Sequence, residues 1–285
     1  MPKYRLNCGT LVFAILTKGV FMATYGSIQS RQNQTVGKYA SLKEKKNRDS
    51  LSLFCFEGEK LFLEAISSKA EFECVFTLER QTDFCMKHLE NIDCPLYEVN
   101  ESVYAKLSDE KSPEGIFCVC RIKENQVKKD GITILLDTIQ DPGNLGTIMR
   151  SAEAFGCKKI ICSSGCCDVF STKTVRASMG SVFRMPVVRN ADLLSEIDEL
   201  ENSGVKVYAC ILDRKAGKLS EIEDFSNTAF IIGNEGNGIS EKIRTRCNHY
   251  TYIQMMENAS ESLNASVAAS IIMYKAFEKE NQNKK

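Results

Sequence analysis

Short apolar runs alternate with amphipathic stretches along most of the chain. The first half contains the apolar runs LSLFCFEG, FECVFTL, LYEV and GIFCVCRI, and apolar residues with helical spacing lie between them. Such alternation predicts strands joined by helices, which is typical of a small α/β sandwich. Before the first run, residues 35–50 have the pattern of one basic amphipathic helix.

The same alternation resumes in the second half. Its apolar runs are ITILLD, KKIIC, MPVV, KVYACIL, TAFII and YTYIQMM, and a last helical pattern extends from Ser262 to Glu280. Gly156 and Gly204 follow two of the predicted helices, where glycine can adopt the left-handed conformation that ends a helix. The pattern predicts a mostly parallel sheet with helices on both faces. Such sheets bind their ligands at the carboxyl ends of the strands.

The two halves are joined by a segment without apolar periodicity. Residues 123–131, KENQVKKDG, carry mixed charge and end in glycine, as expected of an exposed linker. We therefore expect an N-terminal extension at 1–24, a first domain at 25–122, this linker, and a second domain at 132–285. With 285 residues the chain is long enough for two domains with substantial cores.

The N-terminal extension leaves alternatives open. It contains the apolar run CGTLVFAILTKGVFMA, which Lys18 interrupts, so a transmembrane helix is not expected. Translation could instead begin at Met22, with residues 1–21 lying upstream of the true start. A degenerate signal peptide is the other alternative, but it conflicts with the cysteine usage.

Composition excludes several classes of protein. Lys+Arg and Asp+Glu are equal at 37 each, so no global field draws the molecule to nucleic acid, and a polyanion would need a local patch. The 13 cysteines lack the spacing of a zinc site, and only two histidines could assist them. Scattered cysteines in odd number indicate buried thiols in a reducing cytosol, hence a cytoplasmic protein without a metal or a membrane partner.

Three polar or glycine-rich clusters follow predicted strands. They are LLDTIQDPGNLGTIMR at 135–150, GNEGNGIS at 233–240 and MMENASESLNASVAAS at 255–270. Because the strands are expected to be parallel, their carboxyl ends lie at one edge of the sheet. The three clusters are therefore expected to form one site.

The glycine-rich cluster does not match a nucleotide-binding loop. Its glycines are Gly233, Gly236 and Gly238, which is not the spacing of a dinucleotide-binding fold, and no Lys-Ser/Thr pair follows as in a P-loop. Glu235 would repel a phosphate from the backbone N–H groups. These features argue against a dinucleotide-dependent oxidoreductase. The glycines could also do no more than permit a tight turn.

The other two clusters suggest helix caps and a cation. Asn144 can cap the helix that follows it, and Ser262 can cap the last helix, whose first turns are rich in small residues. Arg150 offers a planar fork of donors that suits a phosphate. The alternative for Arg150 is a surface ion pair with Glu153 or Glu79.

Together the three clusters resemble the motifs of the SpoU (TrmH) family of RNA 2′-O-ribose methyltransferases. The matching residues are Asn144-Leu145-Gly146 through Arg150, Gly233-Asn234-Glu235-Gly236-Asn237-Gly238 and Ser262-Leu263-Asn264, and residues 175–187 resemble the intervening sequence. The first domain, with FEGEKLFLEA and SPEGIFCV, is similar to the ribosomal-protein-like substrate-binding domain of many members. Gln254, Met255, Met256 and Asn258 stand in place of the Ile-Pro-Met run and the Gly that usually precede the third motif and border the cofactor.

The resemblance implies a fold and a chemistry that the patterns alone do not. The fold is a SPOUT-type α/β domain with a deep trefoil knot, an exception to the rule against threaded chains, and the assembly is a homodimer that completes the RNA site. Glycines of the loop would let backbone pass close to backbone and to the cofactor. The activity is methyl transfer from S-adenosylmethionine to a ribose 2′-hydroxyl, with 23S ribosomal RNA as the expected substrate. A transfer RNA substrate and a non-catalytic RNA-binding role in ribosome assembly are the alternatives.

The resemblance also assigns the site residues. The catalytic set would be Arg150, Asn144, Glu235, Ser262 and Asn264, and the cofactor would contact Gly233, Gln254, Met256 and Leu263. Arg150 would position the phosphate next to the target ribose, because a guanidinium rarely loses its proton and so makes a poor base. RNA would also contact the basic segment KYASLKEKKNR of the first domain, although such charge runs are often only solvated helix faces. Because the 2′-hydroxyl must reach a deep site, single-stranded or looped RNA is expected.

Overall fold

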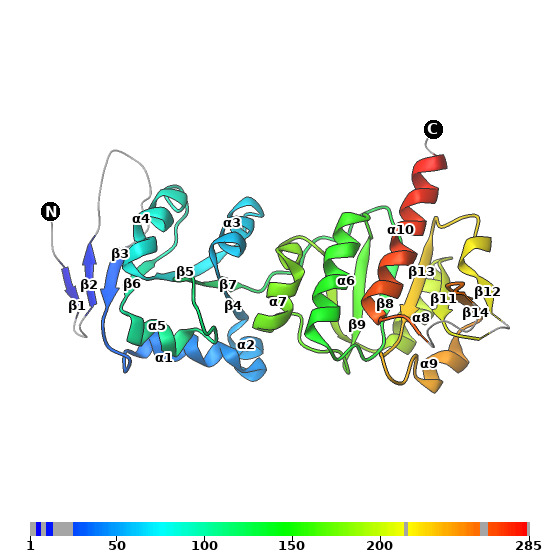
Figure 1. Ribbon diagram of the computed structural model, residues 1–285, viewed down its shortest axis with the longest axis horizontal. Helices are drawn as coiled ribbons and strands as arrows, with labels where there is room; N and C mark the ends of the chain where they lie inside the picture. The colour runs from blue at the N-terminus through cyan, green and yellow to red at the C-terminus, as the bar shows by residue number, and fades with distance from the viewer. Residues whose placement is uncertain (1–3, 7–9, 14–24, 214–215, 257–261, 284–285) are drawn as a thin grey trace. The chain divides into compact units, whose positions relative to one another are not determined.

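The computed structural model describes residues 4–6, 10–13, 25–213, 216–256 and 262–283 (Figure 1). The chain divides into two compact units. The first consists of residues 1–123 with 170–172, and the second of residues 124–169 with 173–285. Most of the expectation about residues 1–21, including a start at Met22, lies outside the described residues.

The first unit is built on a mixed seven-stranded sheet. Its strand order is β1-β2-β3-β6-β5-β7-β4, in which β3, β6 and β5 pair in parallel and the other pairs are antiparallel. The strands are β1 Tyr4–Leu6, β2 Thr10–Phe13, β3 Tyr25–Ile28, β4 Leu53–Glu57, β5 Phe72–Thr77, β6 Leu96–Val99 and β7 Ile116–Arg121. The helices are α1 Gln34–Ala40, η1 Ser41–Lys43, α2 Lys45–Leu51, α3 Glu59–Ser67, α4 Glu79–His88 and α5 Glu101–Leu107. Figure 1 shows α1 and α5 on one side of this sheet and α3 and α4 on the other.

The predicted single helix at 35–50 is wrong. The chain forms α1, η1 and α2 there, and Glu44 between η1 and α2 has extended backbone with ψ 132°. Leu42 is fully buried, and the Arg48 guanidinium donates to the carbonyl oxygens of Leu42 and Lys43 at 2.5 and 2.8 Å. The break is therefore stabilised by a buried arginine that caps the turn before it.

The basic segment 38–48 offers less free charge than its sequence suggests. Arg48 is only 4% exposed. Three lysines form ion pairs, which are Lys38–Glu73, Lys43–Asp109 and Lys45–Asp49. The segment is thus largely neutralised by its own unit, so that the alternative of a solvated and paired helix face describes it better than a free basic patch.

The second unit contains a seven-stranded sheet in which every pairing is parallel among the described residues. The strand order is β10-β9-β8-β13-β11-β14-β12. The strands are β8 Thr133–Leu136, β9 Lys159–Ser163, β10 Val187–Ala191, β11 Lys206–Cys210, β12 Gly217–Lys218, β13 Thr228–Ile232 and β14 His249–Tyr252. The helices are α6 Pro142–Ala154, α7 Thr172–Ser178, η2 Ser181–Phe183, α8 Leu193–Asn202, η3 Leu219–Glu221, α9 Glu241–Arg246 and α10 Ala265–Asn283. The expected parallel α/β sheet of the second half is confirmed.

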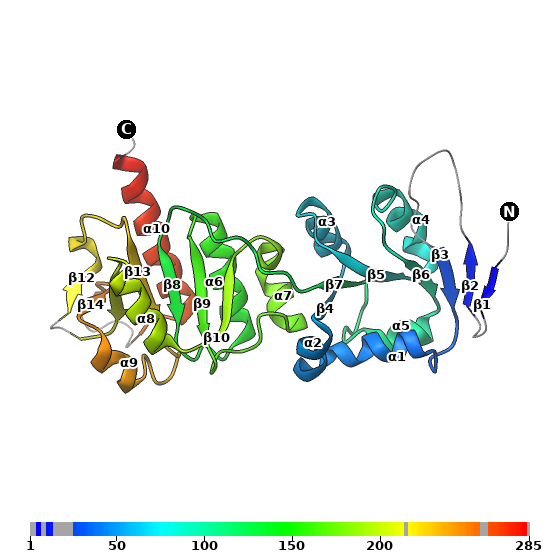
Figure 2. The same cartoon turned by 180° about the vertical axis from the view of Figure 1, so that it is seen from behind.

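Helices cover both faces of this sheet. Figure 1 shows α6 and α10 in front of the strands, and Figure 2, from behind, shows α8 on the opposite face. Alternate strand residues such as Leu135 and Ile231 pack against Leu193 and Ile197 of α8. Because both faces are buried, the strands are continuous apolar runs, as is typical of parallel sheets.

The order of strands in this sheet reverses at β8. After β8 the chain builds β9 and β10 on one side, and then returns to build β11, β13 and β14 on the other side. Ligands of such sheets bind where the strand order reverses, outside the carboxyl ends of the strands. The trefoil knot expected from the resemblance depends on the path from β14 to α10. Residues 257–261 of that path lie outside the described residues, so the knot stays a prediction.

Helix α6 is held closely between two neighbours. A Cβ atom at Gly146 would lie 2.5 Å from the Cβ of Ala177 on α7, so only glycine allows this approach. On another side, Ser151 and Ser270 of α10 share a hydrogen bond of 2.7 Å between their hydroxyls. Helix α6, which follows β8, is therefore fixed on two sides.

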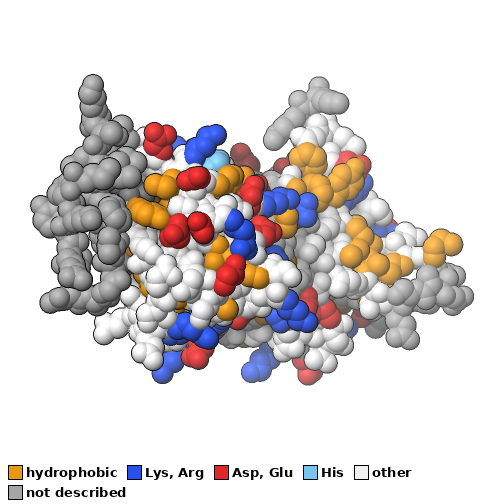
Figure 3. Space-filling view, turned by 60° about the vertical axis from the view of Figure 1, so that its left-hand side comes forward, with side chains coloured by type: hydrophobic (Ala, Val, Ile, Leu, Met, Phe, Trp, Pro, Cys, Tyr) orange, Lys and Arg blue, Asp and Glu red, His pale blue; other side chains and the backbone are white. Residues whose placement is uncertain are grey.

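Helix α10 leaves a row of large apolar side chains on the surface. Val267, Ile271, Tyr274 and Phe277 are each at least 37% exposed and recur at helical spacing. The rings of Tyr274 and Phe277 lie 5.6 and 5.9 Å from that of Phe155 at the end of α6. Figure 3 shows hydrophobic side chains gathered at the upper right, on the surface that α10 helps to form. We call these four residues the α10 apolar face.

The described residues contain neither a candidate membrane span nor a candidate metal site. No helix there is both long and apolar enough to cross a membrane. No group of three His, Cys, Asp or Glu side chains in those residues could hold a metal ion. The cysteines described there are free thiols, most of them buried.

Candidate active site

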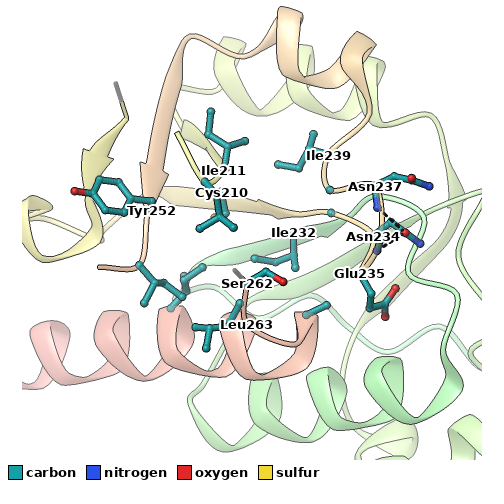
Figure 4. Close-up of a pocket in the computed structure, with 18 of the residues that line it drawn as sticks. Cys210, Ile211, Ile232, Asn234, Glu235, Asn237, Ile239, Tyr252, Ser262 and Leu263 are labelled. Atoms are coloured by element: carbon teal, nitrogen blue, oxygen red, sulfur yellow. Dashed lines mark hydrogen bonds between the residues drawn. The ribbon is translucent and has the colours of Figure 1, made fainter. Parts of the chain in front are cut away.

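A pocket opens at the carboxyl ends of β11, β13 and β14 and at the start of α10 (Figure 4). Its volume is about 390 Å³, within the usual range for small-molecule sites. Four loop segments line it, namely residues 210–212 after β11, 232–239 after β13, 252–253 with 255 after β14, and 262–263 before α10, and Arg244 of α9 and Ala265, Ala268 and Ile272 of α10 complete the lining. Two of the three clusters found in the sequence thus contribute to one pocket, and the first lies next to it.

The loop after β13 is a tight hairpin. Asn234 and Gly238 exchange two backbone hydrogen bonds of 2.9 Å each. A Cβ at Gly233 would lie 2.2 Å from the carbonyl carbon of Gly238, and Gly238 itself has φ +67°. Gly236 has no such constraint, because a Cβ there would meet only the Asn234 side chain at 3.5 Å. The expectation that glycine permits close backbone passage therefore applies to Gly233, and at Gly238 the reason is the left-handed backbone.

Asn234 and Asp137, which were not predicted as site residues, fix this hairpin to the end of β8. The Asn234 side chain donates to the Thr138 carbonyl at 2.8 Å and accepts from the N–H groups of Gly236 and Asn237 at 2.9 and 3.1 Å. The buried carboxylate of Asp137 accepts from the Ser240 N–H at 2.7 Å. The sequence analysis did not assign these roles, although an asparagine two residues before a glycine is a known turn signal.

Asn144 does not cap helix α6, contrary to the sequence prediction. The helix begins at Pro142, and Asp141 is the cap, since its carboxylate accepts from the Asn144 N–H at 2.8 Å. Proline fits the first helical position because its missing N–H would be unpaired there. The Asn144 side chain is therefore available to reach across the strand ends.

Asn144 joins the other two clusters. Its Nδ2 donates to Glu235 Oε1 at 2.6 Å, and its Oδ1 accepts from Asn264 Nδ2 at 3.0 Å. These residues are 91 and 120 positions from Asn144 in the sequence. The three residues, which we call the amide relay, form one chain of side-chain hydrogen bonds at the edge of the pocket.

Asn264, and not Ser262, precedes and caps helix α10. Its Oδ1 accepts from the N–H groups of Ser266 and Val267 at 2.9 and 3.3 Å and from the Ser266 hydroxyl at 2.7 Å. Ser262 lies on the pocket wall instead (Figure 4). The helix start was predicted too early, because the small residues after Ser262 were taken as its first turn.

Arg150 lies apart from the amide relay in this chain. It is exposed on α6 and does not line the pocket. Within the described residues its guanidinium has no hydrogen bond or ion pair with another side chain. Glu153, the suggested partner, is bound by Arg184 and Ser181. Burial raises the pKa of Glu153, but these hydrogen bonds outweigh it and lower that pKa below its usual value.

The segment after β14 presents alternate residues to the pocket. Ile253 and Met255 line it, whereas the side chains of Gln254 and Met256 face solvent, with Met256 82% exposed. Gln254 and Met256 are not among the residues that line the pocket, so the cofactor contacts predicted for them stay a prediction. Gly233 and Leu263, the other two predicted contacts, do line the pocket.

The pocket has the chemistry that a nucleoside with a charged tail requires. Apolar side chains that include Ile211, Ile232 and Leu263 offer walls for a flat ring. Backbone groups of the hairpin and of the strand ends offer donors and acceptors. Glu235 supplies a negative charge that favours a sulfonium. The residues present therefore fit S-adenosylmethionine.

Comparisons with known proteins agree with this chemistry. Residues 131–274 match the family model described as the SpoU rRNA Methylase family, and residues 33–118 match the model described as the MRM3-like substrate binding domain. The 23S rRNA (guanosine(2553)-2′-O)-methyltransferase RlmP of Bacillus subtilis is 35% identical over 247 residues, which are 87% of this chain and 97% of that protein.

Solved structures share the fold over nearly the whole chain. The AdoMet-bound rRNA methyltransferase from Sinorhizobium meliloti has a TM-score of 0.76 and 26% identity, and the match covers 89% of this chain and 98% of that one. The crystal structure of an RNA 2′-O ribose methyltransferase has a TM-score of 0.73 and 26% identity, with 90% and 99% covered.

The fold, the pocket and these similarities define the class of enzyme: it is an S-adenosylmethionine-dependent RNA 2′-O-ribose methyltransferase. The chain belongs to the SpoU rRNA methylase family. The resemblance noted in the sequence, the expected activity and the expected cofactor are thereby confirmed.

The hairpin geometry predicts a large effect of alanine at Gly233 and almost none at Gly236. We expect Gly233→Ala to abolish S-adenosylmethionine binding and to lower the free energy of unfolding by about 1–3 kcal/mol, because the new Cβ would clash with the Gly238 backbone. Urea unfolding and isothermal titration measure the two effects.

Gly236→Ala is the matched control, since its Cβ meets no backbone atom. It should leave the unfolding free energy within about 0.5 kcal/mol of the wild type. Equal loss of stability in both variants would contradict the close backbone approach at Gly233.

Proposed function

We propose that the enzyme methylates a guanosine ribose in 23S ribosomal RNA, at the nucleotide that corresponds to the RlmP target. The observation that carries this proposal is the 35% identity to RlmP over nearly its full length, and the amide relay, through Glu235 in the pocket lining, supports methyl transfer at this site. Ribosomal RNA is a substrate of the cytoplasm, where we place the protein.

In this proposal the amide relay organises the reacting end of the site. S-adenosylmethionine supplies a methyl group on a positively charged sulfur, and transfer requires the ribose oxygen in line with it. The Glu235 carboxylate, held by Asn144, would attract that positive charge and would leave its second oxygen for the ribose. Ser262 on the pocket wall contributes a hydroxyl beside it.

Arg150 positions the RNA in this mechanism and does not act as a base. Its fork of donors suits the phosphate next to the target ribose, and its charge lowers the cost of removing the hydroxyl proton. Arg150 lies outside the pocket of its own chain, so it reaches a ribose most directly in the site of a second copy.

We propose a homodimer formed through the α10 apolar face. Four large apolar side chains at helical spacing on one exposed face are more than a soluble monomer usually leaves uncovered. A twofold interface would bury this face against itself. Arg150 lies on the exposed side of α6, which packs beside α10 through Ser151 and Ser270.

The first unit, with residues 25–122 as its predicted extent, binds RNA in this proposal. The match of residues 33–118 to a substrate-binding domain model supports the assignment. Because the segment 38–48 is mostly paired within its own unit, other surfaces of the unit supply the RNA contacts.

The proposed substrate predicts the loss of one ribose methylation. Deleting the gene should remove a 2′-O-methyl group from the 23S RNA nucleotide that corresponds to the RlmP target, and purified protein with S-adenosylmethionine should restore it. The Arg150→Ala variant should restore less than about a hundredth as much while binding the cofactor normally. Ribose methylation is mapped by alkaline fragmentation.

Three results would contradict these assignments. If the gene deletion removes a methyl group from a transfer RNA, that RNA is the substrate and 23S RNA is not. If the deletion leaves RNA methylation unchanged and the protein still binds RNA, a role as a ribosome-assembly factor is favoured. Full activity of Arg150→Ala would exclude its proposed role.

The proposed interface predicts that one charged substitution dissociates the dimer into monomers. Ile271→Glu places a charge in the α10 apolar face, so the protein should become a monomer in light scattering and lose activity. Leu63→Glu, at an exposed leucine of α3 in the other unit, should stay dimeric. A wild-type protein that is monomeric at micromolar concentration would rule out the dimer.

A further inference from the structure

Helix α9 presents one cation to the cofactor pocket. Of the described residues that line the pocket, Arg244 is the only Lys, Arg or His, and Glu235 is the only Asp or Glu. The Arg244 side chain is 52% exposed, and one of its terminal nitrogens donates to Asp213 Oδ2 at 3.0 Å. A guanidinium has five donors, so this ion pair leaves most of them for a second acceptor.

The two charges are held by different segments: Glu235 accepts from Asn144 at the start of α6, whereas Arg244 on α9 pairs with Asp213, which follows β11. Figure 4 shows Glu235 pointing to the lower side, near the start of α10, and Ile239 on the upper side, from which the chain continues into α9. Ile211, Ile232 and Leu263 line the same pocket with apolar side chains. A bound molecule with a cationic centre and an anionic end would satisfy both charges at once.

S-adenosylmethionine has this distribution of charge. Its sulfonium and ammonium groups are positive, and its carboxylate is its only anion. We propose that Arg244 binds the carboxylate at the amino-acid end of the cofactor, an inference that rests on the proposed placement of the cofactor in this pocket. The sulfonium then lies on the Glu235 side, next to the amide relay. The reverse orientation would bring the carboxylate against Glu235 and leave Arg244 without a ligand anion.

Asp213 orients Arg244 for this contact. It follows residues 210–212, which line the pocket directly after β11, so its ion pair fixes the guanidinium to the pocket rim. An ion pair this exposed adds little to stability by itself. Its effect is to restrict a long side chain to one geometry, which reduces the entropy that ligand binding must remove.

Two ligands that differ only in the carboxylate test the assignment. Isothermal titration compares S-adenosylmethionine with decarboxylated S-adenosylmethionine on the full-length wild type and on Arg244→Gln. The variant should bind S-adenosylmethionine about tenfold more weakly, which is the usual effect of one hydrogen-bonded charge contact in a partly exposed site. It should bind the decarboxylated ligand at least as well as the wild type does. Arg244→Lys, which keeps the charge but not the fork, should give an intermediate affinity for S-adenosylmethionine.

Arg246→Gln is the matched control on the same helix. Arg246 pairs with Asp198 and Glu201 and does not line the pocket, so its loss should change neither affinity. The carboxylate contact would be overturned if Arg244→Gln lowered the affinity for both ligands equally, or if it lowered the affinity for neither. A wild type that binds neither ligand would instead overturn the proposed placement of the cofactor, and this inference with it.

Discussion

The side-chain amide of Asn144 is the contact on which the arrangement of the site depends. Asn264 Oδ1 is occupied by the N–H groups at the start of α10, so its Nδ2 must face Asn144. Asn144 then presents its own Nδ2 to Glu235, whose ionised carboxylate can only accept. The direction of every hydrogen bond in the relay is therefore set by the backbone of one helix.

This constraint connects the sheet to the chemistry. The relay joins the segments that follow β8, β13 and β14, which parallel pairing brings to one edge of the sheet. Gly233, Asn234 and Asp137 shape the middle segment and fasten it to the end of β8. As a result, the Glu235 carboxylate, to which we assign a place beside the reacting methyl group, is held by rigid elements, as an efficient site requires.

Much of the fold could be predicted from the sequence. The apolar runs placed most of the strands, because strands buried on both faces of a parallel sheet leave an unmistakable pattern. The broken helix at 35–50 and the short strand β3 were missed, since a buried arginine and pairing with β6 determine them. Local helix and strand propensities do not depend on such tertiary contacts, so they could not predict these two features.

The site was predicted in part. The motifs named the members of the amide relay, but spacing alone suggested that Asn144 was a helix cap, whereas Asp141 has that role. Asn234 and Asp137 were not found, because their partners are backbone groups of distant segments. Nor could the sequence place Arg150 outside the pocket of its own chain, since that depends on how α6 packs.

A double-mutant cycle tests most directly whether the residues of the amide relay act as one unit. Asn264→Asp keeps the acceptor that caps α10 but removes the donor to Asn144, and Asn144→Ala removes the bridge itself. If the relay acts as one unit, the double variant transfers methyl groups about as fast as the slower single variant, as measured in single turnovers. Rate losses that multiply in the double variant would show that the two residues act independently and would contradict the relay.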